Sequence, residues 1–116
     1  MTFKTWDGYT YDYPAIIDTG APVSIIPFRI WGQCAIKQLG QDTIRGLVDR
    51  DECDLEVTAA QVTCALTDGA SITDDIRIRA DLAPTSEMPL ILGFKDLLER
   101  AELCCNYQSG VAYLEI

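Results

Sequence analysis

Hydrophobic and polar residues alternate along most of the chain, a pattern typical of β-strands with two different faces. Residues 3–6 and 9–13 alternate on either side of Asp7-Gly8, which predicts a tight β-hairpin. Within residues 55–66 the alternation changes parity at Ala59-Ala60, and this phase slip predicts a β-bulge or a bend between sheets. The chain is therefore expected to be mainly β.

Two short apolar runs interrupt the alternation, and both predict buried strands. Ala15-Ile16-Ile17 runs directly into turn residues, and Leu90-Ile91-Leu92 ends at Gly93. After this glycine, apolar residues over 94–101 recur at the i, i+3, i+4 and i+7 spacing of one short amphipathic helix.

The remaining segments complete an all-β domain over residues 1–116. Residues 22–50 carry irregular apolar positions and several glycines, which indicate short strands and loops. Residues 103–107 and 111–116 predict two closing strands around a Ser109-Gly110 turn. The short helix near the C-terminus is the one helix that we expect.

The composition is typical of a soluble globular protein. Hydrophobic residues make up 48% of the chain, and the net charge is −9. This negative charge repels phosphate backbones, so no nucleic-acid partner is expected, and solubility is a simpler explanation for it than a basic substrate. The chain has no membrane-spanning apolar run, and its first residues lack the apolar core of a signal peptide, so we expect no membrane contact.

The counts of histidine and cysteine narrow the possible chemistry. The chain has no histidine, which is the usual general base of serine and cysteine nucleophile systems. Its five cysteines include no C-x-x-C pair, so neither a disulfide framework nor a metal site is expected. Reduced cysteines favour a cytoplasmic location, although the chain could also be the soluble domain of a longer or processed protein.

The segment most informative about chemistry follows the first apolar run. Asp18 comes after three apolar residues, where a lone carboxylate must be hydrogen-bonded, paired or protonated. Gly20 permits a sharp turn and the close approach of another backbone, and the Thr19 hydroxyl can bond nearby main-chain groups. Because histidine is absent, a carboxylate has to carry any hydrolytic chemistry.

Asp18-Thr19-Gly20-Ala21, with its apolar lead-in and the trailing Ser24-x-Ile26-Pro27, resembles the active-site loop of retropepsin-like aspartic proteases. Ile91-Leu92-Gly93 is similar to the hydrophobic-hydrophobic-glycine segment that lies beside that loop, and the spacing after it resembles bacterial members of the family. The resemblance implies a retropepsin-like acid protease lobe, closed and β-barrel-like, in which Asp18 is the catalytic carboxylate. Thr19, Gly20 and Ala21 would support the loop, and Ile91, Leu92 and Gly93 would flank it.

The resemblance also implies a homodimer that cleaves extended peptides or proteins. A two-fold axis beside Asp18 would bring two copies of this carboxylate within hydrogen-bond reach, and repulsion would leave one ionised and one protonated. The ionised carboxylate would activate a water and the protonated one would polarise the scissile carbonyl, with no metal or organic cofactor. Thr19 would brace the two loops, and the N-terminal strand and residues 111–116 would form an intersubunit sheet.

A substrate-covering flap is expected between the two motifs. The best candidate is the segment Thr43–Val48, in which Ile44, Gly46 and Leu47 would contact substrate. It lacks the glycine-rich tip of the viral enzymes, and the alternative is an ordinary surface loop.

A second function remains open beside endopeptidase activity. The chain could be a retropepsin-like module that dimerises or binds peptides with weak or no hydrolysis. The atypical flap and the short arm before Asp18 favour this alternative. A third possibility is a regulatory or processing domain of a longer polyprotein.

Overall fold

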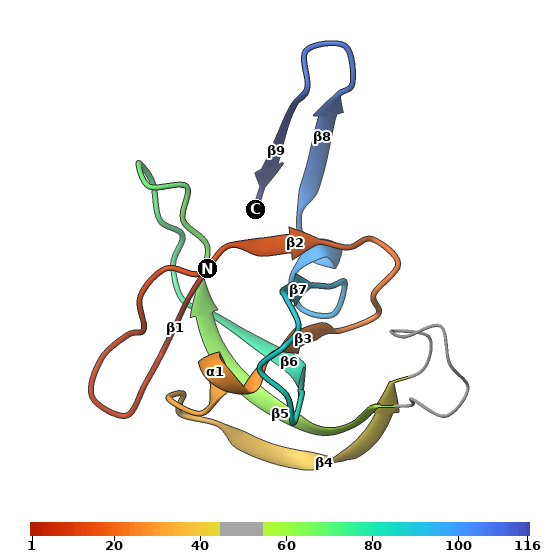
Figure 1. Cartoon of the computed structure of the whole chain (residues 1–116). Coiled ribbons are helices and arrows are strands. Elements are labelled where there is room, and N and C mark those ends of the chain that lie inside the picture. The colour runs from red at the N-terminus through yellow and green to blue at the C-terminus, as the bar shows by residue number, and fades with distance from the viewer. Residues whose placement is uncertain (45–54) are drawn as a thin grey trace.

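The structure is a computed structural model that describes residues 1–44 and 55–116, and most of its regular structure is β, as predicted (Figure 1). Among these residues, no helix is long and apolar enough to cross a membrane. The strands and helices are β1 (Thr2–Phe3), β2 (Ala15–Ile17), β3 (Ser24–Ile26), α1 (Phe28–Trp31), β4 (Lys37–Ile44), β5 (Leu55–Ala65), β6 (Ile76–Leu82), β7 (Leu90–Leu92), the 3₁₀-helix η1 (Leu98–Arg100), β8 (Glu102–Asn106) and β9 (Val111–Glu115).

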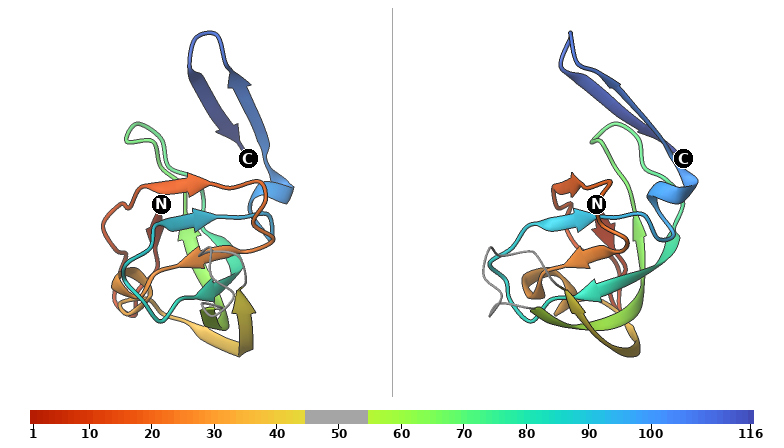
Figure 2. Two further views of the ribbon diagram at one scale, coloured as in Figure 1. Left: turned by 45° about the vertical axis from the view of Figure 1, so that its right-hand side comes forward. Right: turned by 90° about the vertical axis from the view of Figure 1, so that its right-hand side faces the viewer.

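The first seven strands form one curled sheet, and Figures 1 and 2 show it as half of a barrel. Its strand order is β1-β5-β6-β3-β7-β2, and β4 pairs with the same edge of β5 as β1 does. The pairs β2–β7 and β3–β6 are parallel, whereas β3–β7 is antiparallel. Strand β7 therefore lies between β2 and β3, and this placement sets the geometry of the loop that joins them.

The predicted phase slip in β5 is confirmed, and its cause lies in the neighbouring strand. Gln38 pairs with Ala60 and Gly40 pairs with Ala59, so Leu39 is an extra residue in β4. This β-bulge bends the strand pair, and both alanines are buried at the bend. The apolar residues of β5 thus change from one face to the other at Ala59-Ala60, where the curled sheet buries both faces of the strand.

The N-terminal hairpin is confirmed in part, because the chain turns back at Asp7-Gly8 but residues 9–13 form no strand. Lys4 and Tyr9 form an antiparallel bridge, and the Thr5 N–H donates to the Gly8 carbonyl at 2.8 Å. The Met1 ammonium donates to the Tyr13 carbonyl at 2.7 Å, and this bond joins the two arms of the hairpin at their open end.

The inside of the curled sheet is filled by two apolar clusters. The larger one packs beneath β5, β6 and β7 and is centred on Phe3, Ile26, Ile30, Ile78, Leu82, Leu90 and Leu97, all of them buried. The smaller one joins the buried residues Ala21, Ile25, Ala83 and Ile91 with the partly buried Ile44, Leu55 and Met88. The smaller cluster matters for function because it contains the last residue of the Asp18-Thr19-Gly20-Ala21 motif.

The helix predicted over residues 94–101 is largely absent. A turn replaces its first half, and only Leu98–Arg100 form a 3₁₀ turn. Asp96 interrupts the helix because its backbone φ is 63°, a left-handed conformation that aspartate tolerates. Its carboxylate accepts the Arg79 N–H at 2.9 Å, so a tertiary contact with β6 holds the turn. The apolar spacing reflects the burial of Leu97 and Leu98 without a helix.

A short helix stands where only strands and loops were predicted. Residues Phe28–Trp31 form one turn, α1, which buries Ile30. The Trp31 indole N–H donates to the Ala83 carbonyl at 2.7 Å and fixes this turn to the end of β6. A single turn of this kind is too short to show helical periodicity in the sequence.

The C-terminal hairpin is a separate two-stranded sheet, and the two closing strands are those predicted. It projects from the body of the molecule in Figures 1 and 2. Val111, Tyr113 and Ile116 on it are more than half exposed. A lone two-stranded hairpin is marginally stable in water, so these apolar side chains favour contact with a further surface.

Candidate active site

The loop that carries Asp18 crosses the end of β7. It leaves β2 on one side of β7 and enters β3 on the other, so residues 18–23 must pass over the residue that follows Leu92. That residue is Gly93, and Figure 2 shows β2, β7 and β3 in succession. The topology therefore brings the two sequence motifs together, as the resemblance implies.

The loop approaches Gly93 too closely for any side chain. A Cβ atom at this position would lie 2.4 Å from the Val23 carbonyl oxygen and 2.9 Å from that of Ala21. The Gly93 N–H donates to the buried Ser24 hydroxyl at 2.9 Å, and the Phe94 N–H donates to the Ala21 carbonyl at 3.0 Å. These contacts fix the loop from both ends.

Asp18 lies at the start of the loop and is held by main-chain bonds. Its N–H donates to the Leu92 carbonyl at 3.0 Å, which extends the β2–β7 ladder by one residue. Its carboxylate Oδ1 accepts the Gly20 N–H at 2.9 Å, and its carbonyl accepts the Ala21 N–H at 3.1 Å. The side chain is therefore oriented by the turn that the glycine forms.

In the single chain this site is exposed, and the prediction of a buried strand before it is wrong. Ile16 and Ile17 are 54% and 40% exposed because β2 is the edge strand of the sheet. Asp18, Thr19 and Gly20 are exposed as well, so Asp18 does not lie in a low-dielectric environment here. Only Ala21 of the motif is buried.

The other predicted site residues are placed as follows. The Thr19 side chain makes no hydrogen bond with the part of the chain that the structure describes. Ile44 ends β4, pairs with Leu55 and packs against the smaller apolar cluster. Gly46 and Leu47, the other two flap residues, lie outside the described residues.

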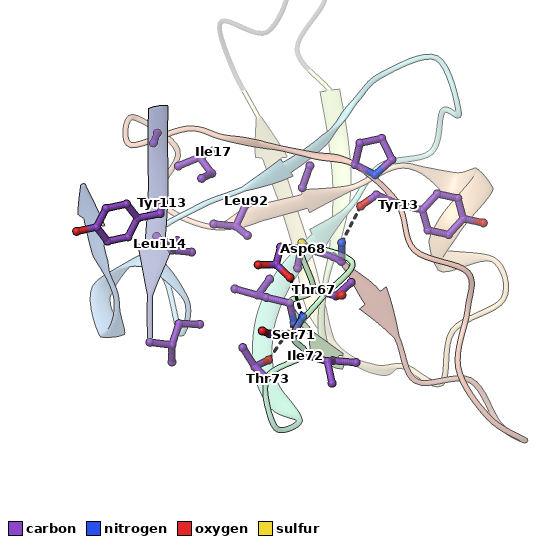
Figure 3. A pocket seen from close by; sticks show the side chains of 16 residues that line it. Tyr13, Ile17, Thr67, Asp68, Ser71, Ile72, Thr73, Leu92, Tyr113 and Leu114 are labelled. Carbon is purple, nitrogen blue, oxygen red and sulfur yellow. Dashed lines mark hydrogen bonds between the residues drawn. The ribbon is translucent and has the colours of Figure 1, made fainter. Parts of the chain in front are cut away.

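A groove separates the C-terminal hairpin from the body next to this edge. It has a volume of about 530 Å³. Figure 3 shows Ile17 and Leu92 on the body side, Leu114 facing them from β9, and the turn that carries Ile72 closing the groove. Because Ile17 precedes Asp18, the groove begins beside the candidate catalytic loop.

Sequence reasoning missed a buried carboxylate on β6. Asp81 is only 3% exposed, and its Oδ1 has no hydrogen-bond partner within residues 1–44 and 55–116. Burial raises the pKa of Asp81, with a smaller contribution in the same direction from the nearby Asp42, while Arg79 lowers it. In the sequence Asp81 continues the polar positions of Arg77 and Arg79, which indicated an exposed face.

The arrangement can supply one oriented, exposed carboxylate per chain. Within residues 1–44 and 55–116, no group of three or more His, Cys, Asp or Glu side chains gathers in a way that could hold a metal ion. No protein-family model matches the sequence, and no curated protein shows significant similarity to it.

Replacing Gly93 by alanine should destabilise the fold by about 2 kcal/mol or more, because the added methyl group overlaps backbone that cannot shift alone. Urea unfolding monitored by tryptophan fluorescence measures this. Gly8→Ala is the matched control, because no atom lies within 4 Å of a Cβ placed there. Similar losses in both variants would show that the loop does not approach Gly93 as described.

Replacing Asp81 by asparagine should stabilise the protein at neutral pH by about 1 kcal/mol or more, the cost of an unpaired buried charge. The native pKa of Asp81 is raised above its unfolded value, so the wild type loses stability as pH rises through the unfolded pKa and up to the native one. The advantage of the variant should therefore be large at pH 7 and small near pH 3. An equal difference at both pH values in urea titrations would contradict this.

Proposed function

We propose that the chain is an aspartic endopeptidase that acts as a homodimer through two copies of Asp18. The observation that carries this proposal is the loop at residues 18–24, which orients the carboxylate with main-chain bonds while Gly93 allows the loop to pass over β7. The retropepsin-like resemblance of both segments supports the same function.

A single chain supplies only half of the required chemistry. Peptide hydrolysis by carboxylates needs one that accepts a proton from water and one that donates a hydrogen bond to the scissile carbonyl. Two Asp18 carboxylates that share a proton across a two-fold axis would divide these roles, because repulsion keeps both from ionising together. The exposure of Asp18 in the single chain is consistent with a site that a second copy completes.

Two features of the exposed surface support a second copy. The edge strand β2 carries the exposed side chains of Ile16 and Ile17, which would become buried in a dimer. The groove between β2 and the C-terminal hairpin lies directly beside them, and Ala112, Leu114 and Ile116 line its other side (Figure 3). A strand or side chains of the partner that filled this groove would bury apolar surface and bring the two Asp18 loops together.

The N-terminal strand remains a predicted part of the intersubunit sheet, but β1 offers no free edge at Thr2 and Phe3 in the single chain. It pairs with β5 on one side, and on the other the Phe3 carbonyl accepts the Thr10 N–H at 2.8 Å. The C-terminal hairpin is therefore the better candidate, since β9 pairs only with β8 among the described strands.

The second candidate function is a dimeric peptide-binding module without hydrolysis. The exposed edge of β2 favours it, because an extended peptide could add to that edge as a further strand. It shares the dimer and the peptide surface with the proposed function, and it differs only in what Asp18 does.

Asp18→Asn should reduce peptide cleavage by at least about a thousandfold while the fold and the dimer persist, because the amide can neither share a proton nor act as a base. Digestion of a peptide library followed by mass spectrometry measures this. Asp74→Asn, which neutralises an exposed carboxylate in the loop before β6, is the matched control and should keep full activity. Cleavage retained by Asp18→Asn would refute the catalytic assignment.

Ala112→Asp should convert the dimer into a folded monomer and abolish cleavage, because it places a charge in the groove at an exposed position. Analytical ultracentrifugation gives the mass, and wild-type activity should fall more steeply than linearly on dilution. Gln108→Asp, in the exposed turn of the same hairpin and outside the groove, is the control. A fully active monomer would exclude the shared site.

A further inference from the structure

The buried carboxylate of Asp81 lies on the same face of the sheet as the candidate catalytic loop. Asp81 pairs with Ile25, Ile25 pairs with Ile91, and Ile91 pairs with Ile16. Directly paired residues project from one face of a sheet, so these four side chains form a row across it. Asp18 follows Ile16 by two residues and so shares this face.

The distance along this row suits a peptide substrate. Three strand spacings separate β2 from β6, which amounts to about 14 Å. An extended peptide advances about 3.3 Å per residue, and a lysine or arginine side chain adds about 6 Å of reach. A long side chain a few residues from the scissile bond could therefore reach Asp81 while the bond lies at Asp18.

Among the residues that the structure describes, nothing around Asp81 accounts for a carboxylate. Its neighbours in the row are Ile25 and Ala59, and the smaller apolar cluster lies on the same face. Buried polar atoms in proteins are almost always hydrogen-bonded, and an apolar residue at this position would pack without an unpaired oxygen. The unpartnered Oδ1 therefore calls for a donor from outside the part of the chain that the structure describes.

The charge around Asp81 favours a cationic donor. Asp42 lies on the same face and adds negative potential, which outweighs the effect of Arg79 on the Asp81 pKa. The chain as a whole carries a net charge of −9. Both features attract a positively charged group and repel an acidic one.

The apolar cluster next to Asp81 fits the rest of a basic side chain. Ile44, Leu55 and Met88 are only partly buried and pack against this cluster. Lysine and arginine carry three or four methylene groups before the charge, and these stems pack on apolar surface while the charged end pairs with an acceptor.

We propose that Asp81 is a specificity-determining residue that selects peptide substrates with a lysine or arginine side chain a few residues from the scissile bond. The ammonium or guanidinium group would donate to the unpartnered Oδ1, and Ile44, Leu55 and Met88 would contact the stem. This inference rests on the proposed function, because it is that function that makes the ligand an extended peptide.

Peptide binding in the Asp18→Asn background tests the inference independently of cleavage. Fluorescein-labelled decapeptides, each with lysine or with the uncharged isostere norleucine at one position, are titrated by anisotropy at low salt. For at least one position we expect the lysine peptide to bind about tenfold more tightly or better. Adding Asp81→Asn should bring this ratio to within about twofold of one.

Two further variants make the result interpretable. Asp74→Asn removes one exposed negative charge and should keep the lysine preference, so it controls for the net charge of the protein. Asp81→Leu also removes the carboxylate, suits the apolar surroundings and should lose the preference in the same way, which covers a failure of Asp81→Asn to fold.

The outcomes separate the two proposals. A lysine preference that persists without the Asp81 carboxylate, or the absence of any such preference in the Asp18→Asn protein, overturns the inference. Wild-type protein that binds lysine peptides through Asp81 but cleaves none upholds the inference and refutes the endopeptidase function. Cleavage by the wild type without any preference for basic side chains would uphold the endopeptidase function and overturn the inference about Asp81.

Discussion

The geometry of the candidate site depends on one close approach, that of the loop at residues 18–24 to Gly93. Strand β7 separates β2 from β3, so the connection between them has to pass over the end of β7. A Cβ atom on Gly93 would lie 2.4 Å from the Val23 carbonyl oxygen, which leaves room for glycine alone. The buried Ser24 hydroxyl then accepts the Gly93 N–H. The turn that bonds the Gly20 N–H to the Asp18 carboxylate lies within this crossing loop.

Most strands could be predicted because their patterns are local, and so could the segments Asp18-Thr19-Gly20-Ala21 and Ile91-Leu92-Gly93. Alternation identified most strands, and the parity change at Ala59-Ala60 marked the bend. The helix over residues 94–101 was predicted wrongly because its apolar spacing is also that of a buried turn. What interrupts it is the left-handed backbone of Asp96 and its bond to Arg79, a tertiary contact that the local sequence does not show.

The exposure of β2 and the burial of Asp81 escaped prediction for the same reason. Whether a face of a strand is covered depends on where the strand lies in the sheet. Ile16 and Ile17 are apolar but belong to an edge strand. Asp81 continues the polar parity of β6 but lies near its end, where both faces of the strand are buried. At the apolar edge and at the buried carboxylate, local pattern and fold disagree, and both places point to a binding partner.

A crystal structure of the dimer would show whether two Asp18 carboxylates form one site. The measurement is the separation between the carboxylate oxygens of Asp18 in one protomer and those of Asp18 in its partner. We expect a two-fold axis beside the loops and a separation within hydrogen-bond reach, about 3 Å. A stable dimer whose two carboxylates lie more than about 6 Å apart would contradict the shared site.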